Sequence, residues 1–344
     1  MVDKNDNIIL VEVTRGAIVE SCHRGAIAVV NSNNELMASM GNIDFVTYLR
    51  SSAKPHQAIS VVMSGAAKHF NFTSEEIALM AGSHSGETYH ADCAARILEK
   101  IKLPLTALCC GVHTPFSHTA AKELGKNANE LHNNCSGKHA GMLATALMGN
   151  YSLEDYYKTD HPVQKAIAKV IAEFAGIGEE DLIVSIDGCS AATFAITIRQ
   201  MALIYSRLVN PESLRPELLV ATKQVANAML EFPEMVAANT GRIDTDLMRA
   251  LPGKLIAKAG AEGVYTIGLL PSAKYPLGLG IAIKIEDGDI GRARNAAILG
   301  AVEQLDILDS VQMEQLKAKY LPPIKNHRGL LVGEVRPAFQ LKIE

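Results

Sequence analysis

The chain has 344 residues, of which 48% are hydrophobic and 20% charged, and its formal net charge is -4. This composition can fill a sizeable apolar core and excludes a disordered chain. Neither a basic stripe nor a polybasic segment is present, so no nucleic-acid or membrane partner is expected. No run of about 18 apolar residues and no apolar signal-peptide core occur, which favours a cytoplasmic protein. The six cysteines form no C-x-x-C pair and are interpreted as reduced thiols.

The first 40 residues are rich in β-branched side chains and alternate in polarity. We predict strands over residues 8–15, 25–30 and 36–40, arranged as an antiparallel meander. The next 200 residues are mainly helical in pattern, interrupted by a short buried strand over 182–186. The helices are expected over 51–65, from Thr73 onward with a capping box to Glu76, and over 89–101, 138–148, 162–175, 191–208 and 216–230.

Strand patterns return near the C-terminus, over residues 254–259, 264–269 and 280–285. A helix over 292–305 and a last strand within 330–341 follow. Strands from both ends of the chain can pair into one antiparallel sheet, with the helical block inserted between them. We therefore expect an α/β (α+β) fold.

This fold is expected to be one unit over residues 1–344 with two lobes. The sheet lobe takes about 1–50 plus 250–344, and the mainly helical lobe takes 51–249. The crevice between the lobes is the expected place for a site.

Ser51-Ser52-Ala53-Lys54 forms an S-x-x-K tetrad. On a helix the spacing places Ser51 and Lys54 on one face, where a neutral lysine can take the serine proton. The tetrad alone is weak evidence, because a chain of this composition contains about one by chance. A solvated helix start is the simpler interpretation of the tetrad taken by itself.

Two further elements favour a catalytic interpretation. Ser83 lies in a turn-like stretch between two predicted helices, and Lys258 lies at the end of a predicted strand. With the tetrad they follow, imperfectly, the ordered S-x-x-K, serine and K-T-G elements of penicillin-binding-type enzymes. Two neighbouring lysines disfavour each other's charge, so one has a lowered pKa and can act as a base. Ser83 is then suited to pass a proton to the leaving ammonia, and the backbone amide of Ser51 to form half of an oxyanion hole.

A second group of chemically capable residues lies where polar segments turn into helices. Cys135 begins one such helix, and Cys189 follows the predicted strand that ends at Asp187. The two thiols can meet and bind a metal such as zinc, with Lys138 or His139 as a third ligand. The alternatives are thiols buried as small apolar groups and a core histidine. Asp187 either orients a substrate amine or caps its turn.

Six runs of sequence carry a family resemblance. They are Val11–Gly16, Arg50–Pro55, Ala81–Glu87, Asn134–Met142, Asp187–Cys189 and Lys258–Gly263. Together they look like the rhizobial-type L-asparaginase family, also called asparaginase II. The resemblance covers about residues 11–305, and the tail beyond about 309 is not covered. It implies a fold like that of serine β-lactamases and glutaminases.

The resemblance also implies hydrolysis of L-asparagine to L-aspartate and ammonia through an acyl-enzyme. By motif position, Ser51 with Lys54 and Ser83 with Lys258 are two Ser–Lys pairs. Either serine can be the one acylated, and Ser51 is favoured by its position at a helix start. A homodimer is expected.

A zinc ion held by Cys135, Lys138 and Cys189 is implied by the same resemblance. The substrate is a small zwitterion, so its site needs partners for an α-amine and an α-carboxylate. Arg50, Asp187 and His139 are the expected substrate-binding residues, and the loop Asn239-Thr240-Gly241-Arg242 is expected to border the site.

Three alternatives remain at the level of sequence. The same fold can hydrolyse glutamine, another side-chain amide or a β-lactam. A zinc-activated water would define a different class of amidohydrolase. A protein that binds an amide without cleaving it is the third alternative.

Overall fold

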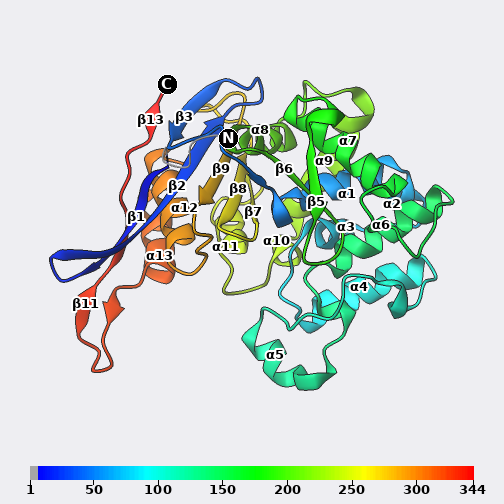
Figure 1. Ribbon diagram of the computed structural model, residues 1–344, viewed down its shortest axis with the longest axis horizontal. Coiled ribbons are helices and arrows are strands. Elements are labelled where there is room, and N and C mark those ends of the chain that lie inside the picture. The colour runs from blue at the N-terminus through cyan, green and yellow to red at the C-terminus, as the bar shows by residue number, and fades with distance from the viewer. Residues whose placement is uncertain (1–6) are drawn as a thin grey trace.

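The computed structural model describes residues 7–344 and contains an eight-stranded antiparallel sheet in that part of the chain (Figure 1). The strands of this sheet come from the two ends of the chain. They are β1 (Ile8–Arg15), β2 (Ile18–Val30), β3 (Leu36–Met40), β7 (Leu255–Ala259), β8 (Val264–Leu269), β9 (Leu279–Ile285), β12 (Val335–Pro337) and β13 (Lys342–Ile343). The order is β12-β1-β2-β9-β8-β7, with β3 beside β2 and β13 beside β3.

Helices dominate the middle of the chain and lie to one side of this sheet in Figure 1. They are α1 (Lys54–Met63), α2 (Ala66–His69), α3 (Ser74–Ala81), α4 (Thr88–Lys100), α5 (His118–Leu124), α6 (Ser136–Met148), α7 (Pro162–Ala175), α8 (Ile198–Val209), α9 (Pro216–Glu231), α10 (Pro233–Val236) and α11 (Ile243–Ala250). Two more helices, α12 (Ala293–Gln304) and α13 (Ser310–Tyr320), precede the C-terminal strands.

Two smaller sheets complete the fold. One has the order β4-β6-β5, with β4 (Val46–Tyr48), β5 (Ile183–Ile186) and β6 (Ala192–Thr197). The other is the hairpin of β10 (Ile324–Lys325) and β11 (Leu331–Gly333). The first of these sheets matters for the site, because β4 leads into the S-x-x-K tetrad and β5 leads into Asp187.

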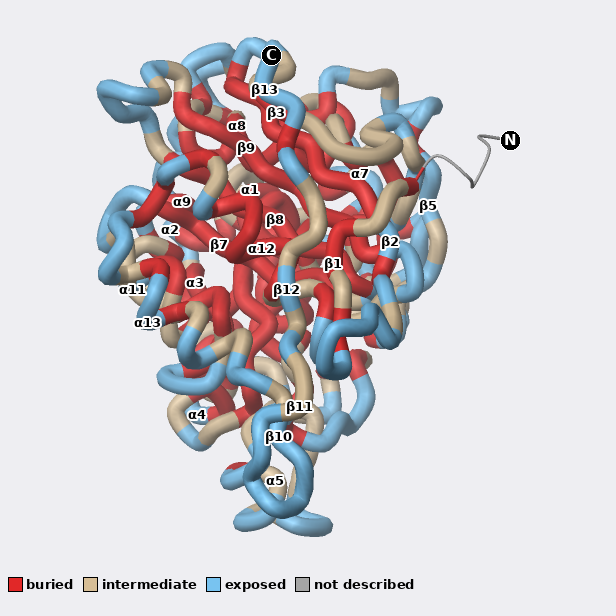
Figure 2. Tube along the Cα trace, turned by 90° about the vertical axis from the view of Figure 1, so that its left-hand side faces the viewer, coloured by how far each residue is buried: buried red, intermediate tan, exposed pale blue. Residues whose placement is uncertain are grey.

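The main sheet is held against the helical block chiefly by α8, which packs on β2, β8 and β9. Burial is continuous along β8, β9 and the second half of β2, and Figure 2 shows buried chain in red around β8 and β9. Gly280 on β9 permits the close approach, because a Cβ atom there would lie 1.8 Å from the carbonyl oxygen of Ala202 on α8. Side chains larger than hydrogen therefore cannot occupy this point without moving the helix.

The predicted fold class is confirmed. Strands from both termini form one antiparallel sheet, and a helical block is inserted between them, as expected for a serine β-lactamase/glutaminase-like arrangement. The predicted capping box is present, since Thr73 Oγ1 accepts from the Glu76 amide at 3.3 Å and Glu76 accepts from the Thr73 amide at 2.8 Å. The division into two lobes near residues 50 and 250 stays a prediction.

Two predictions about individual elements were wrong. The helix expected over 191–208 is a strand, β6, followed by α8. The six residues of β6 include buried β-branched and aromatic side chains, which favour a strand. Thr197 then caps α8 together with Gln200. The strand expected to be buried, β5, lies at a sheet edge and leaves Ile186 71% exposed. No helix within residues 7–344 is both long enough and apolar enough to cross a membrane.

Candidate active site

Ser83 is fixed by a tight junction at the end of α3. The residue before it, Gly82, approaches α10 so closely that a Cβ atom would lie 2.4 Å from the carbonyl oxygen of Met235. The Ser83 amide then donates to the carbonyl of Val236 at 2.7 Å. Only glycine allows this approach, and the result is a serine whose backbone position is set by two elements.

Two lysines from distant parts of the chain meet at the Ser83 hydroxyl. Lys54, the first residue of α1, donates from Nζ to Ser83 Oγ at 2.9 Å, and Lys258 on β7 donates to the same oxygen at 2.8 Å. Each amine has one further acceptor, the carbonyl of Asn134 for Lys54 and that of Ala259 for Lys258. All three side chains are buried.

The environment of the two amines favours their neutral form. Burial lowers the pKa of Lys54. Burial also lowers the pKa of Lys258 well below its usual value, and the nearby charge of Lys54 lowers it further. A neutral lysine beside a hydroxyl can accept its proton, so the trio of Lys54, Ser83 and Lys258 has the chemistry of a base and its partner.

Ser51 lies on a short 3-10 helix (Arg50–Ala53) and not in the first turn of the α-helix. The residue before it, Arg50, has a positive φ of 49°, a strained conformation for a residue with a Cβ. Over residues 7–344 the Lys54 amine donates to Ser83, and the bond between Ser51 and Lys54 joins only their backbones, from the Lys54 amide to the Ser51 carbonyl. The structure thus brings both predicted lysines to Ser83, where the sequence predicted two separate pairs.

A cavity of about 290 Å³ opens onto this group. Ser51 and Ser83 both line it, so either hydroxyl can meet a bound substrate. The other residues that line it include Phe116, Asn134, Gly260, Ala261, Arg242 and Arg294. The loop expected to border the site therefore contributes Arg242.

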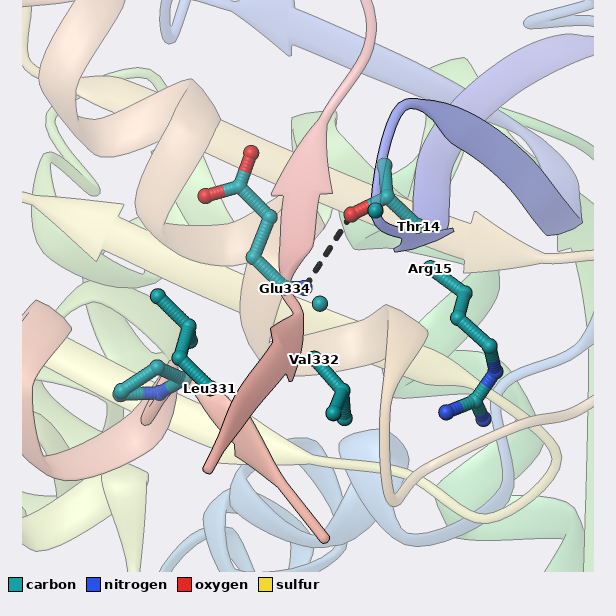
Figure 3. Close-up of a pocket in the computed structure, with 8 residues that line it drawn as sticks. Thr14, Arg15, Leu331, Val332 and Glu334 are labelled. Atoms are coloured by element: carbon teal, nitrogen blue, oxygen red, sulfur yellow. Dashed lines mark hydrogen bonds between the residues drawn. The ribbon is translucent and has the colours of Figure 1, made fainter. Parts of the chain in front are cut away.

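A larger cavity, of about 610 Å³, lies elsewhere (Figure 3). It is formed between the β1–β2 hairpin and the segment from β11 to β12, where the Glu334 amide donates to Thr14 Oγ1 at 3.2 Å. None of the predicted catalytic or metal-binding residues lines it. The smaller cavity is therefore the candidate active site.

The predicted metal ligands also come together. Lys138 Nζ donates to Cys189 Sγ at 2.9 Å, and a hydrogen bond from Cys135 is the main reason that the pKa of Cys189 falls to about 5, despite burial. The same bond and burial raise the pKa of Cys135 to about 12. No cluster of three His, Cys, Asp or Glu residues suited to a metal occurs among the described residues, and the amine of Lys138 is the donor that lies beside the Cys189 thiol. Two thiols and an amine fit a borderline cation such as zinc.

The lysine–serine group lies beside the thiol–amine group, which consists of Cys135, Lys138 and Cys189. The backbone oxygen of Asn134 accepts from Lys54 at 2.7 Å, and its side-chain oxygen accepts from Cys135 at 3.3 Å. One residue thus contacts both groups. A substitution in one group is therefore expected to affect the other group.

The cavity lining includes none of the predicted substrate-binding residues, Arg50, Asp187 and His139. Arg50 donates to Asp187 at 2.7 Å, and its other end lies 3.8 Å from Glu262. Burial alone would raise the pKa of Asp187. The charges of Lys138 and Arg50 outweigh burial and hold this pKa below its usual value. His139 is buried, its ring bonded to the hydroxyl of Tyr156 at 2.7 Å, and it is not among the residues that line the cavity.

Three residues of the site were not singled out from sequence. Arg294 comes from the first turn of α12, Phe116 from the segment before α5, and Ile290 from the segment before α12. None lies in a motif with a known spacing. Only the polar stretch around Arg242, which the sequence marks as a loop before a helix, gave a signal for this side of the cavity.

Comparison with solved structures finds glutaminases. A probable glutaminase from Bacillus subtilis complexed with 6-diazo-5-oxo-L-norleucine is 13% identical, with a TM-score of 0.41 and coverage of 83% of this chain and 84% of that chain. A Bacillus glutaminase in the presence of 4.3M NaCl is 12% identical, with a TM-score of 0.40 and coverage of 83% and 91%. Mglu in its native form is 13% identical, with a TM-score of 0.45 and coverage of 88% and 70%. Similarity at this level transfers no activity.

Among curated protein sequences there is no significant match. The family comparison is different, because the family described as L-asparaginase II matches residues 11–337. That span includes both serines, both lysines and the three predicted metal ligands. Since the match takes in nearly the whole chain, the protein is an amidohydrolase that belongs to the L-asparaginase II family.

Proposed function

We propose that the protein is an L-asparaginase that hydrolyses L-asparagine to L-aspartate and ammonia through a serine acyl-enzyme. One observation carries the proposal. The Ser83 hydroxyl lies within 3 Å of two buried lysine amines, in a small cavity that Ser51 also lines. A pre-positioned base and two hydroxyls are what an acyl transfer needs. A cavity of about 290 Å³ suits a substrate as small as asparagine.

In this mechanism Ser51 is the nucleophile and Ser83 is the proton relay. Ser51 is half-buried and faces the cavity, whereas Ser83 is held between two amines. The Ser51 oxygen attacks the side-chain carbonyl carbon, and its proton passes to a neutral lysine through Ser83. The amide of Ser51, presented by the strained turn at Arg50, is suited to stabilise the oxyanion.

The bonds balance over two steps. In the first, the ester bond to serine forms, the carbon–nitrogen bond breaks, and the lysine-borne proton leaves with nitrogen as ammonia. In the second, water attacks the ester and gives its proton to the lysine freed in the first step. The ester bond then breaks and releases aspartate, and the lysine returns the proton to the serine oxygen, which restores the hydroxyl.

Trapping identifies the acylated serine. A diazoketone analogue of asparagine, followed by peptide mapping by mass spectrometry, is expected to label the peptide that contains Ser51. A label on Ser83 would exchange the two roles and keep the class of mechanism. A protein that releases ammonia from asparagine but forms no serine adduct, and keeps its rate in Ser51→Ala and Ser83→Ala, would overturn the acyl-enzyme.

Substrate choice is tested by ammonia release from L-asparagine and L-glutamine, measured side by side. We expect faster turnover of asparagine, because glutamine is one methylene longer in a small cavity. A hydrophobic methylene alone discriminates by roughly 10- to 200-fold. Equal rates on the two amides would replace asparaginase by a general side-chain amidase.

We also propose a zinc site formed by Cys135, Lys138 and Cys189. The two thiols and the amine lie together in a buried setting that can lose protons to a cation. When bound, zinc would supply a fixed positive charge and an open coordination position for an oxygen ligand. Asn134 helps to orient Cys135, because its side-chain oxygen accepts from Cys135 while its backbone oxygen accepts from Lys54.

A homodimer in the cytoplasm completes the proposal. The free thiols suit a reducing compartment. Two hairpins carry exposed apolar side chains suited to contact with a second copy, among them Ile18 at 72% exposure and Leu331 at 70%. Light scattering on the purified protein is expected to give twice the chain mass, and the double variant Ile18→Ser/Leu331→Ser to give the chain mass. A monomeric wild type at micromolar concentration would refute the dimer.

A further inference from the structure

Two arginines line the same cavity as the two serines. Arg242 lies just before α11 and Arg294 lies in the first turn of α12. Neither belongs to the lysine–serine or thiol groups. Their guanidinium groups are therefore available for a role that the reaction steps leave open, which is to hold the part of the substrate that does not react.

The contacts of Arg242 connect it to Ser83, the proposed proton relay. It donates from Nη1 to the Ser83 carbonyl at 3.1 Å and to Ser85 Oγ at 3.2 Å, and from Nη2 to Asp244 at 3.3 Å. Its side chain is 19% exposed and thus reachable from the cavity. Because Arg242 contacts the backbone of Ser83, a group bound at Arg242 lies close to the Ser83 hydroxyl. This closeness favours a short substrate.

Arg294 has fewer acceptors than donors. It donates to the carbonyl of Gly260 at 3.3 Å, and its buried Nε has no acceptor among the described residues. The guanidinium also lies 5.7 Å from the centroid of the Tyr265 ring, which fixes its plane. A guanidinium has five N–H donors, so this one can donate two parallel hydrogen bonds to the oxygens of a carboxylate.

The charges around the cavity leave a positive excess. Asp244 is the buried carboxylate that faces both arginines, and it also accepts from the Ala259 amide at 2.6 Å. Asp289 also faces Arg294 and caps the start of α12, but it is only partly buried, so water screens its charge more than that of Asp244. Two guanidinium charges thus face one fully buried carboxylate. The excess calls for an anionic group on the ligand.

We infer that Arg294, together with Arg242, binds the α-carboxylate of the substrate and thereby restricts the enzyme to amino-acid amides. This inference rests on the proposed function. Guanidinium groups match a carboxylate in shape and charge better than an amine does, and they remain charged at all working pH values. The reacting amide then extends from this anchor toward Ser51 and Ser83.

The test compares L-asparagine with β-alaninamide, which keeps the amine and the reacting amide but lacks the α-carboxylate. Ammonia release gives kcat/KM for each. We expect wild type to prefer asparagine, and Arg294→Gln to reduce that preference by about 10- to 100-fold, the range for losing a hydrogen bond to a charged group. Activity on β-alaninamide is expected to stay within about threefold. Arg292→Gln, which removes an exposed arginine two residues away, is the matched control and is expected to keep the wild-type preference.

A second measurement, made on the wild type, tests the carboxylate site even if Arg294→Gln does not fold. Inhibition of the wild type by L-aspartate and by β-alanine compares two products that differ only in the α-carboxylate, and aspartate is expected to bind more tightly. An unchanged preference in folded Arg294→Gln and Arg242→Gln, or equal inhibition by the two products, would overturn the carboxylate site while leaving the asparaginase intact. Wild type that releases ammonia from neither amide would overturn the proposed function and the inference with it.

Discussion

The Ser83 hydroxyl is the point on which the proposed chemistry depends most directly. Ser83→Ala removes the acceptor that Lys54 and Lys258 share at 2.9 and 2.8 Å. Each amine keeps its second partner, a backbone carbonyl. The variant should therefore fold, with its proton path interrupted at one atom.

The size of both effects can be worked out. Loss of a positioned proton-transfer group lowers kcat by about 10²- to 10⁴-fold, which is about 2.7–5.5 kcal/mol in the barrier. The stability loss is smaller, about 1–3 kcal/mol, because two buried donors each lose one of two acceptors. If Ser83 were the nucleophile, the loss of kcat would be on the order of 10⁶-fold.

The assay measures ammonia release together with urea unfolding, on Ser83→Ala, Ser51→Ala and a control. Ser206→Ala is the matched control, because Ser206 is fully buried and also contacts two oxygens, the carbonyls of Asn31 and Leu203. We expect it to lose stability and keep kcat. A folded Ser83→Ala whose kcat is within threefold of wild type would refute the role given to the two lysines.

Three further predictions follow from other parts of the molecule. Gly280→Ala should lose about 3 kcal/mol or more of unfolding free energy, since its Cβ meets a helix carbonyl at 1.8 Å, whereas Gly291→Ala, with open space around it, should change little; urea melts compare them. Cys189→Ser should abolish stoichiometric zinc binding, measured by metal analysis after dialysis, with the fold unchanged by circular dichroism; retained zinc would contradict the ligand set. The acidic limb of the pH profile of kcat/KM should lie well below pH 10, because the pKa of Lys258 is lowered. Asp244→Asn should move this limb to still lower pH, because it removes a carboxylate that raises the pKa of Lys258. A limb that moves to higher pH in this variant would contradict the assignment.

Much of the fold is readable from local patterns. The strands at Ile8–Arg15 and Leu36–Met40 and the helix Pro162–Ala175 fall where alternation and helical spacing predict them. The segment over 191–208 misled because alanine-rich, amphipathic sequence suits either state, and only pairing with β4 and β5 makes Ala192–Thr197 a strand. Tertiary pairing decides such a segment, and a single sequence does not contain that information.

The residues of the site likewise include some that the sequence indicated and some that it did not. Motif spacing singled out Ser51, Lys54, Ser83 and Lys258, but helical geometry and the motif positions of the family both paired Lys54 with Ser51. That inference assumed a regular α-helix from the serine onward. The tetrad instead begins in a 3-10 turn, and the lysine reaches a serine 29 positions away. Arg294 was out of reach for another reason, since nothing in its own helix distinguishes it from a surface arginine.

Two lysines at one hydroxyl give the site a property that neither has alone. Their mutual repulsion and burial disfavour a state in which both are charged, so the pair holds one proton more readily than two. One amine can then serve as base while the other is the acid, and Ser83 lies between them as the atom through which the roles exchange. Acylation needs a base and then an acid, and deacylation needs the same sequence again. In each step the neutral amine takes up a proton and gives it up again, so the pair around Ser83 returns to its one-proton state without exchange with solvent.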